Sequence, residues 1–141
     1  MSDIGNKFVI GKIGFELFGF DINDVTSVVE MKKITRVPGT PDYMEGVINL
    51  RGNVVPVMNL RKKLGFQSEK IDPLWKLIVI RTNKQDELGI IVDEIKKVVD
   101  ILDINRRKIA KTGEFDKYIY GIGKYNDKLI SIININNLLI N

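Results

Sequence analysis

The residues that most often carry catalysis are scarce in this chain, and two of the types are absent. The sequence has no histidine and no cysteine, so a Ser-His-Asp or Cys-His mechanism, a disulfide and a zinc site of the usual kind are excluded. Carboxylate and lysine chemistry remain, with Asp86-Glu87 and Asp93-Glu94 as the nearest pairs. Neighbours on a strand point to opposite faces, which makes poor catalytic partners. We interpret both pairs as exposed surface charge and expect no enzyme.

The composition is typical of a globular domain. Of 141 residues, 44% are hydrophobic and 28% are charged, as in ordinary soluble proteins. No apolar run is long enough to cross a bilayer and no signal peptide is visible, which predicts a cytoplasmic protein. The 22 basic and 18 acidic residues give a net charge of +4. The lysines are scattered in short groups, a pattern more typical of solvated strand ends than of a nucleic-acid surface.

Two alignments within the chain reveal an internal repeat. The segment 18–31 aligns without gaps with 88–101, at an offset of 70 residues (88 − 18). The apolar runs before them, 8–10 and 78–80, fit the same offset. Because glycines and apolar positions coincide, we predict that the chain contains two copies of one structural unit.

The second alignment extends the repeat to the end of the chain. The segment 43–64 aligns with 118–139 at an offset of 75 (118 − 43), and Gly46 meets Gly121. We therefore expect two homologous lobes at about 8–66 and 77–140, with a linker at about 67–76. Short apolar strands punctuated by glycine and proline favour small β-barrels.

The closing hairpins of the two copies differ at the tip. The first has Arg51-Gly52 and the second Asn126-Asp127, the latter a strong turn signal. Since the second copy forms its hairpin with a neutral turn residue, the hairpin does not require Arg51. We interpret Arg51 as a contact residue.

The size of each copy predicts close packing of the lobes. A unit of about 60 residues buries only about 60% of its unfolded surface and is marginal alone. The aligned segments also contain more apolar residues than one barrel wall needs, namely Ile22, Val25, Val28, Ile95, Val98 and Val99. We expect some of them to line the seam between the lobes, where a partner helix can lie. The alternative is that all are plain core.

Several motifs together closely resemble the signature of the CheW chemotaxis adaptor family. They are G-V-I-N-L-R-G at 46–52, V-V-P-V at 54–57, N-L-R at 59–61, I-T-R-V-P at 34–38 and L-G-I-I-V-D at 88–93. The resemblance covers practically the whole chain. It implies an all-β fold of two tandem SH3-like five-stranded barrels packed together as a single domain, which agrees with the repeat.

The resemblance also implies a function. Such adaptors couple the cytoplasmic tip of methyl-accepting chemoreceptors to the regulatory domain of the histidine kinase CheA. They catalyse no reaction, bind no cofactor or metal, and do not insert into the membrane. We therefore expect a free-standing cytoplasmic adaptor that is recruited to membrane receptor arrays.

The family's binding positions carry over to particular residues. The resemblance implies a receptor groove formed by Ile22, Val25, Arg51, Gly52, Ile95, Val98 and Val99. It implies kinase coupling through Arg51, Gly52, Tyr118 and Tyr120. Two positions depart from the family pattern, because Ser27 stands where a glutamate is common and Asn59 where an aspartate is common. The first departure puts a charged contact at position 27 in doubt.

A small basic barrel that binds nucleic acid is the alternative from another class. The net charge of +4 and four tyrosines, Tyr43, Tyr118, Tyr120 and Tyr125, are compatible with it. These aromatic residues do not interleave with one basic strand face, so the adaptor remains the favoured function. Salt-dependent retention on single-stranded DNA would favour the alternative.

Overall fold

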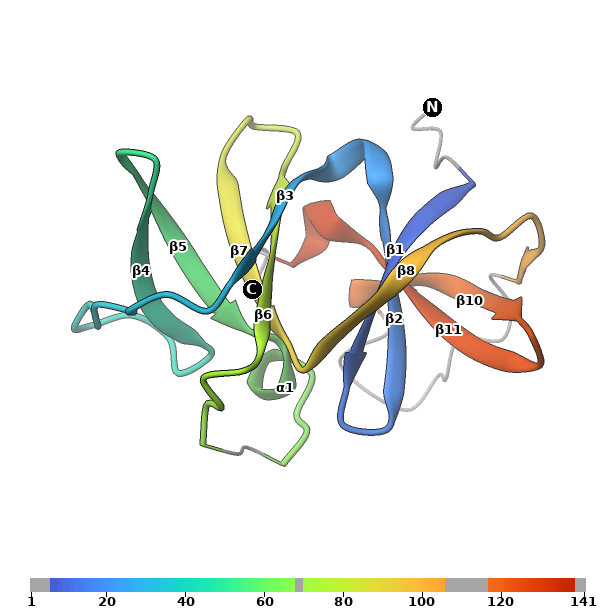
Figure 1. Cartoon of the computed structure of the whole chain (residues 1–141), viewed down its shortest axis with the longest axis horizontal. Coiled ribbons are helices and arrows are strands. Elements are labelled where there is room, and N and C mark those ends of the chain that lie inside the picture. Colours follow the sequence, from blue (N-terminus) through green and yellow to red (C-terminus); the bar gives the residue numbers. More distant parts are fainter. Residues whose placement is uncertain (1–5, 68–69, 106–116, 139–141) are drawn as a thin grey trace.

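Residues 6–67, 70–105 and 117–138 are described by this computed structural model, and they fold mainly as β-strands (Figure 1). The strands are β1 (Lys7–Ile13), β2 (Glu16–Asp21), β3 (Val25–Glu30), β4 (Met44–Leu50), β5 (Asn53–Asn59), β6 (Lys76–Arg81), β7 (Glu87–Val92), β8 (Glu94–Asp100), β9 (Ile104–Asn105), β10 (Ile119–Tyr125) and β11 (Lys128–Ile133). The helical turns include η1 (Ile22–Asp24), α1 (Leu60–Lys63) and η4 (Ile135–Asn137).

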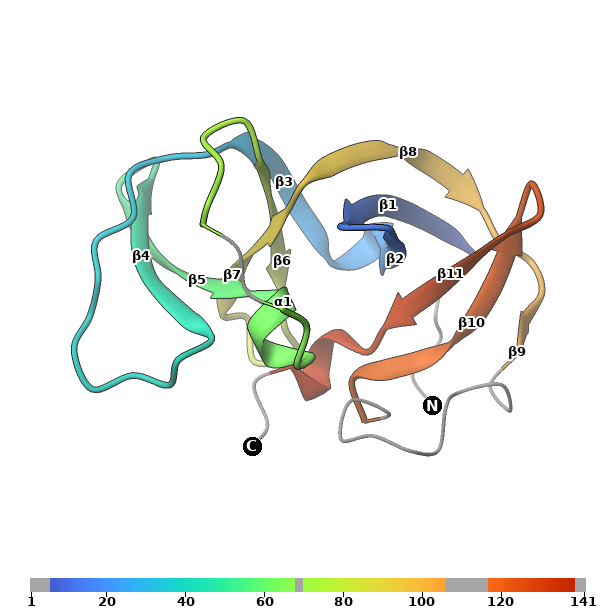
Figure 2. The ribbon, with the colours of Figure 1, turned by 90° about the horizontal axis from the view of Figure 1, so that it is seen from below.

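The strands form two sheets, which lie on opposite sides of Figure 1. Lobe A has the strand order β8-β1-β2-β11-β10-β9, and lobe B has the order β3-β6-β7-β5-β4. Figures 1 and 2 place α1 between the two lobes. The all-β fold of two packed small sheets that the sequence predicts is confirmed.

The lobe boundaries predicted from the sequence, 8–66 and 77–140, are wrong as boundaries of the sheets. Each sheet combines strands from both halves of the chain, because the first hairpin of each half joins the other half's strands. On one side of each exchanged hairpin the joint is a parallel pair, with Val57 opposite Gly89 and Ile132 opposite Gly19. On the other side it is antiparallel, between β3 and β6 in lobe B and between β1 and β8 in lobe A. A sequence repeat shows which segments are alike and does not show which segments pair. Neither half can complete its sheet alone.

The pairing register confirms the repeat itself. In lobe B, Met44 pairs with Met58, and after a bulge Gly46 pairs with Val57. In lobe A the same bulge separates two pairs that lie 75 residues further on, Ile119 with Ile133 and Gly121 with Ile132. The two lobes therefore share their hydrogen-bond pattern as well as their residue types.

One part of the predicted alignment is shifted by a residue. Val28 pairs with Ile78 in lobe B, and its counterpart Val98 pairs with Val9 in lobe A. The first strands of the two halves are thus offset by 69 (78 − 9) instead of 70. The reason is that the β6–β7 loop beyond Thr82 is one residue longer than the tight β1–β2 turn.

Each sheet curls until the chain beyond its edge strand meets the opposite edge. In lobe B, Thr35 bridges to Val47 through two backbone hydrogen bonds of 2.8 Å. In lobe A, Asn105 in β9 pairs with Ile122. The approach in lobe B requires Gly46, where a Cβ atom would lie 2.2 Å from the carbonyl oxygen of Thr35. This closure gives each lobe the barrel form.

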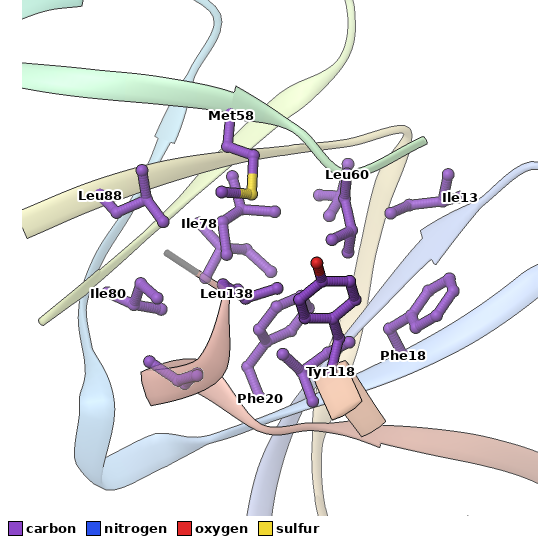
Figure 3. Packing of buried hydrophobic residues seen from close by; sticks show 14 of the residues in the cluster. Ile13, Phe18, Phe20, Met58, Leu60, Ile78, Ile80, Leu88, Tyr118 and Leu138 are labelled. Atoms are coloured by element: carbon purple, nitrogen blue, oxygen red, sulfur yellow. The ribbon is translucent and has the colours of Figure 1, made fainter. Parts of the chain in front are cut away.

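Buried apolar residues form three clusters, of which one joins the two lobes. One fills lobe B around Leu77 and Val79, one fills lobe A around Phe8 and Ile132, and a middle cluster lies between them. The middle cluster takes residues from both sheets and from the helical turn that follows the last hairpin of each half, α1 and η4. Figure 3 labels Ile13, Phe18, Phe20, Met58, Leu60, Ile78, Ile80, Leu88, Tyr118 and Leu138. Each large side chain buried in this way contributes about 1.5–3 kcal/mol, so the seam is part of the core.

Candidate partner-binding site

The turn between β4 and β5 presents Arg51 to solvent in a left-handed backbone conformation. Arg51 and Gly52 have φ angles of 54° and 85°, and Asn49 Oδ1 accepts a 2.9 Å hydrogen bond from the Gly52 N–H. The equivalent turn uses Asn126 and Asp127 at φ 50° and 64°. Asparagine and aspartate adopt this conformation more readily than arginine does. The backbone conformation at position 51 therefore does not favour arginine, which agrees with a role for the Arg51 side chain in contacting a partner.

A polar hollow of about 420 Å³ lies beside Arg51 and is called the B hollow here. Its lining includes Arg51, Arg81, Ser27 and Glu87. A carboxylate oxygen of Glu87 lies 3.4 Å from Nη2 of Arg81 and accepts a 3.1 Å hydrogen bond from the hydroxyl of Thr26. Glu87 of β7, which lies two strands away from β3 in the sheet, supplies the carboxylate of this hollow, and position 27 contributes the side chain of Ser27.

Apolar side chains form a strip along the seam between the lobes. Val25 and its repeat counterpart Ile95 are half-buried and pack against the middle cluster. Val28 and its counterpart Val98 are 45% and 50% exposed, and Ile22 is 37% exposed. We call these five residues the seam strip. Val28 and Val98 pair with Ile78 and Val9, which are residues of the middle cluster. Four of the predicted receptor-groove positions belong to this set, and their role there stays a prediction.

Val99 does not belong to this strip, and its predicted place in a receptor groove is wrong. It is 5% exposed and packs inside lobe A with Phe8 and Ile132. Successive residues of a strand point to opposite faces, so the exposure of Val98 places Val99 in the core.

The two tyrosines predicted to couple the kinase lie in different surroundings. Tyr118 is only 6% exposed, and Figure 3 shows its ring within the middle cluster. Its backbone carbonyl accepts a 2.8 Å hydrogen bond from the Asn134 N–H. Tyr118 is therefore a core residue, and its prediction as a partner contact is wrong. Tyr120 is half-buried against the lobe A cluster, and its predicted contact is untested.

A buried ion pair that sequence reasoning missed connects the two lobes. Nη2 of Arg61 lies 2.7 Å from Oδ2 of Asp93, with the two side chains 4% and 21% exposed. The Arg61 guanidinium also lies 4.3 Å from the centre of the Trp75 ring. The same Asp93 oxygen accepts a 2.8 Å hydrogen bond from the Gly14 N–H of the β1–β2 turn. We call this arrangement the clasp.

The clasp overturns the interpretation of Asp93 as exposed surface charge. It joins α1 of lobe B, the β7–β8 connection and a hairpin of lobe A. The only signal in the sequence was the contrast between Arg61 and its repeat counterpart Asn136, which is exposed. A charged residue that occurs in only one copy of a repeat is easily predicted to be exposed to solvent.

One carboxyl near the seam strip has a perturbed proton affinity. Burial raises the pKa of Asp24 above its ordinary value of 3.8, and the neighbouring carboxylate of Asp21 raises it further. Asp21 itself accepts a 2.9 Å hydrogen bond from the Asn23 N–H and so caps the turn that holds Ile22. The described residues contain no group of three or more acidic, histidine or cysteine side chains arranged to hold a metal ion. Nor does any helix among them have the length and apolar character needed to span a membrane.

The architecture is that of a paired-barrel β scaffold, and comparisons with known proteins identify its family. A family model described as the CheW-like domain matches residues 7–141. The chemotaxis protein CheW of Helicobacter pylori is 35% identical over 134 residues, which cover 94% of this chain and 81% of that protein. The chemotaxis protein CheW of Klebsiella aerogenes is 32% identical over 141 residues, covering 96% of this chain and 82% of its own length.

A solved structure agrees with these relatives. The crystal structure of the scaffolding protein TtCheW from Thermoanaerobacter tengcongensis matches with a TM-score of 0.88 at 33% identity, covering 97% of this chain and 94% of that chain. The chain belongs to the CheW-like family of chemotaxis scaffold proteins, and the resemblance found in the sequence is confirmed.

Proposed function

We propose that this protein is a chemotaxis adaptor that couples transmembrane chemoreceptors to the histidine kinase CheA through protein contacts alone. The observation that carries the proposal is the seam strip, an apolar surface shared by both lobes, in a chain that matches the CheW-like family over residues 7–141. The proposal includes no catalysis and no cofactor. It places the protein in the cytoplasm, recruited to membrane receptor arrays.

The seam strip has the chemistry that a receptor's helical hairpin tip requires. An amphipathic helix binds by laying its apolar face on an apolar surface, and the strip offers Ile22, Val28 and Val98 exposed above half-buried Val25 and Ile95. Val25 and Ile95 pack against the middle cluster, so this part of the strip is held in place before binding. A preorganised surface loses less conformational entropy when a partner docks.

The kinase contact is proposed at the β4–β5 turn. Arg51 and Gly52 are exposed at the tip of the hairpin, and the Arg51 guanidinium can donate several hydrogen bonds to a carboxylate or a carbonyl. Tyr120 remains in the proposal as a second, half-buried contact on the other lobe.

Two binding measurements test the proposal. The full chain is titrated by calorimetry with a receptor hairpin-tip fragment and, separately, with the CheA regulatory domain. We expect saturable binding to both partners. Arg51→Ala should weaken binding of the CheA regulatory domain while leaving the unfolding midpoint unchanged. Absence of binding to either partner at tens of micromolar contradicts the function. Unfolding of the Arg51→Ala protein contradicts the assignment of Arg51 as a contact.

The nucleic-acid alternative loses support from burial. Base stacking needs exposed aromatic faces, yet Tyr118 is buried and Tyr43, Tyr120 and Tyr125 are half-buried. Tyr43 is also covered by the ammonium group of Lys63, 3.9 Å from its ring centre.

A further inference from the structure

The repeat places a second hollow in lobe A at the position equivalent to the B hollow. Under the offsets found in the strand register, Arg51 corresponds to Asn126 and Asn53 to Lys128, and both counterparts line a hollow of about 200 Å³ in lobe A. A hollow of about 470 Å³ shares Leu17, Lys96 and Lys128 with it. We call this joint surface the A hollow.

The charge of the A hollow differs from that of the B hollow. Four lysines line it, Lys12, Lys96, Lys97 and Lys128. The carboxylate that pairs with Arg81 in the B hollow belongs to Glu87, and its counterpart in the A hollow is Leu17. The A hollow therefore has no carboxylate at the position where Glu87 balances Arg81 in the B hollow.

Ion pairing within the chain leaves most of this charge available. Lys96 lies 3.1 Å from the carboxylate of Glu94, with both side chains about half exposed, and such pairs are weak. Glu16 is a carboxylate that also lines this surface. Among the residues that the structure describes, Lys12, Lys97 and Lys128 have no carboxylate within ion-pair distance. Four lysines lining one surface against a single lining carboxylate, Glu16, give it a positive charge that attracts an acidic partner.

Apolar side chains surround the same lysines. Phe15, at the tip of the β1–β2 turn, is 98% exposed, and Leu129 is 64% exposed. Both line the A hollow together with Leu17. Exposed apolar side chains that adjoin one another mark interaction sites, whereas apolar residues scattered singly on a surface do not.

We propose that the A hollow is a second docking surface, and that its occupant is an acidic protein segment with an apolar side chain between carboxylates. The apolar side chain would pack between Phe15, Leu17 and Leu129, and the carboxylates would pair with Lys97 and Lys128. The concave shape and the apolar floor favour a single protruding side chain over a flat lipid surface. This inference goes beyond the proposed function, because none of these residues belongs to the seam strip or to the Arg51 turn.

The test uses the full chain, labelled with ¹⁵N, and a capped peptide in which one leucine stands between two runs of three glutamates. We expect saturable amide shifts centred on Leu17, Lys97 and Leu129. Lys97→Ala combined with Lys128→Ala should weaken binding at least tenfold. The matched control, Lys32→Ala combined with Lys33→Ala, removes the same charge from exposed positions outside the A hollow and should change affinity less than twofold. Thermal unfolding of both double variants should match that of the unaltered protein.

Four results would overturn the inference. The first is absence of saturable shifts at millimolar peptide. The second is equal loss of affinity in the control variant, which would show non-specific charge attraction. The third is undiminished binding of a peptide with alanine in place of the leucine, which would show that the apolar rim takes no part. The fourth is binding of the chain to phosphatidylserine vesicles, lost in the Lys97/Lys128 variant, without binding of the peptide. Loss of receptor or kinase binding plays no part in this test, so the proposed function and this inference can fail separately.

Discussion

The two lobes share one backbone pattern and differ in the side chains that it presents. Val57 opposite Gly89 in lobe B matches Ile132 opposite Gly19 in lobe A, residue for residue. Their hairpin tips share left-handed angles but present arginine in lobe B and asparagine in lobe A. The comparison shows that the repeat preserves what the sheets need, while the side chains at the hairpin tips differ.

The helical turns α1 and η4, which follow the last hairpin of each half, are also alike in their buried apolar residues and different in one side chain. In lobe B, α1 buries Leu60 and Leu64, and in lobe A the tighter η4 turn buries Ile135 and Leu138. Both turns send two apolar residues into the middle cluster. Only lobe B carries an arginine on this turn, so the Arg61–Asp93 ion pair has no counterpart at Asn136, whose side chain instead accepts a hydrogen bond from the Asn83 N–H of the β6–β7 loop.

The largest expected effect comes from breaking the clasp. Arg61→Ala leaves Asp93 partly buried without its ion-pair partner, and removing one partner of a buried pair typically costs about 3–5 kcal/mol. We expect a loss of that size in the free energy of unfolding, measured in urea. The matched variant in the other lobe, Asn136→Ala, removes only the side-chain oxygen that accepts a hydrogen bond from the Asn83 N–H. It should cost less than about 1.5 kcal/mol. Similar losses in both variants would contradict the asymmetry of the seam.

The next effect concerns the seam strip. Val98→Asp puts a charge where we propose that the receptor's apolar face docks, and burying an uncompensated carboxylate is unfavourable. Receptor-tip binding should fall at least tenfold while binding of the CheA regulatory domain changes less than threefold. Val28→Asp, the repeat counterpart, should give the same pattern because the strip spans both lobes. Equal loss of both partners would contradict the assignment, and so would a Val28→Asp protein that binds normally.

A smaller effect is expected at the hairpin tips. Arg51→Asn gives lobe B the turn residue of lobe A, which tolerates the left-handed backbone better. We expect stability to rise by up to about 1 kcal/mol while kinase binding weakens about fivefold, a trade-off common at functional sites. Asn126→Arg should lower stability without changing kinase binding. Unchanged kinase binding in Arg51→Asn would remove Arg51 from the proposed contact.

The smallest effect depends on pH. Because the pKa of Asp24 is raised in the folded state, ionisation of Asp24 reduces the free energy of unfolding as the pH rises through that pKa. Below the pKa that Asp24 has in the unfolded chain, the carboxyl is protonated in both states and has no such effect. Asp24→Asn should therefore be more stable than the unaltered protein at neutral pH, and the difference should vanish below the ordinary value of 3.8. Glu94→Gln, at the equivalent position, loses only an exposed pair with Lys96 and should change stability by less than about 1 kcal/mol. Unfolding curves across this pH range measure both. A difference that persists in acid would contradict the cause given for the shift.

The sequence predicted the repeat and the fold because both leave regular traces. Glycines such as Gly46 recur where a strand bulges or another chain segment approaches, and alternating apolar residues mark the strands. The exchange of first hairpins left no trace, since either pairing of two similar halves satisfies the same pattern. Burial within the site was equally hidden: Tyr118 and Val99 have the residue types of a binding surface and lie in the core. Asp93 looked exposed because its partner Arg61 is distant in the sequence.

An adaptor must hold both of its partners at once, and sedimentation velocity measures this directly. The full chain, a receptor hairpin-tip fragment and the CheA regulatory domain are mixed at concentrations above both dissociation constants. We expect a single boundary that contains all three proteins and sediments faster than either binary complex. A mixture that contains only the two binary complexes would show that the partners compete for one surface, and would contradict the proposed coupling of receptor to kinase.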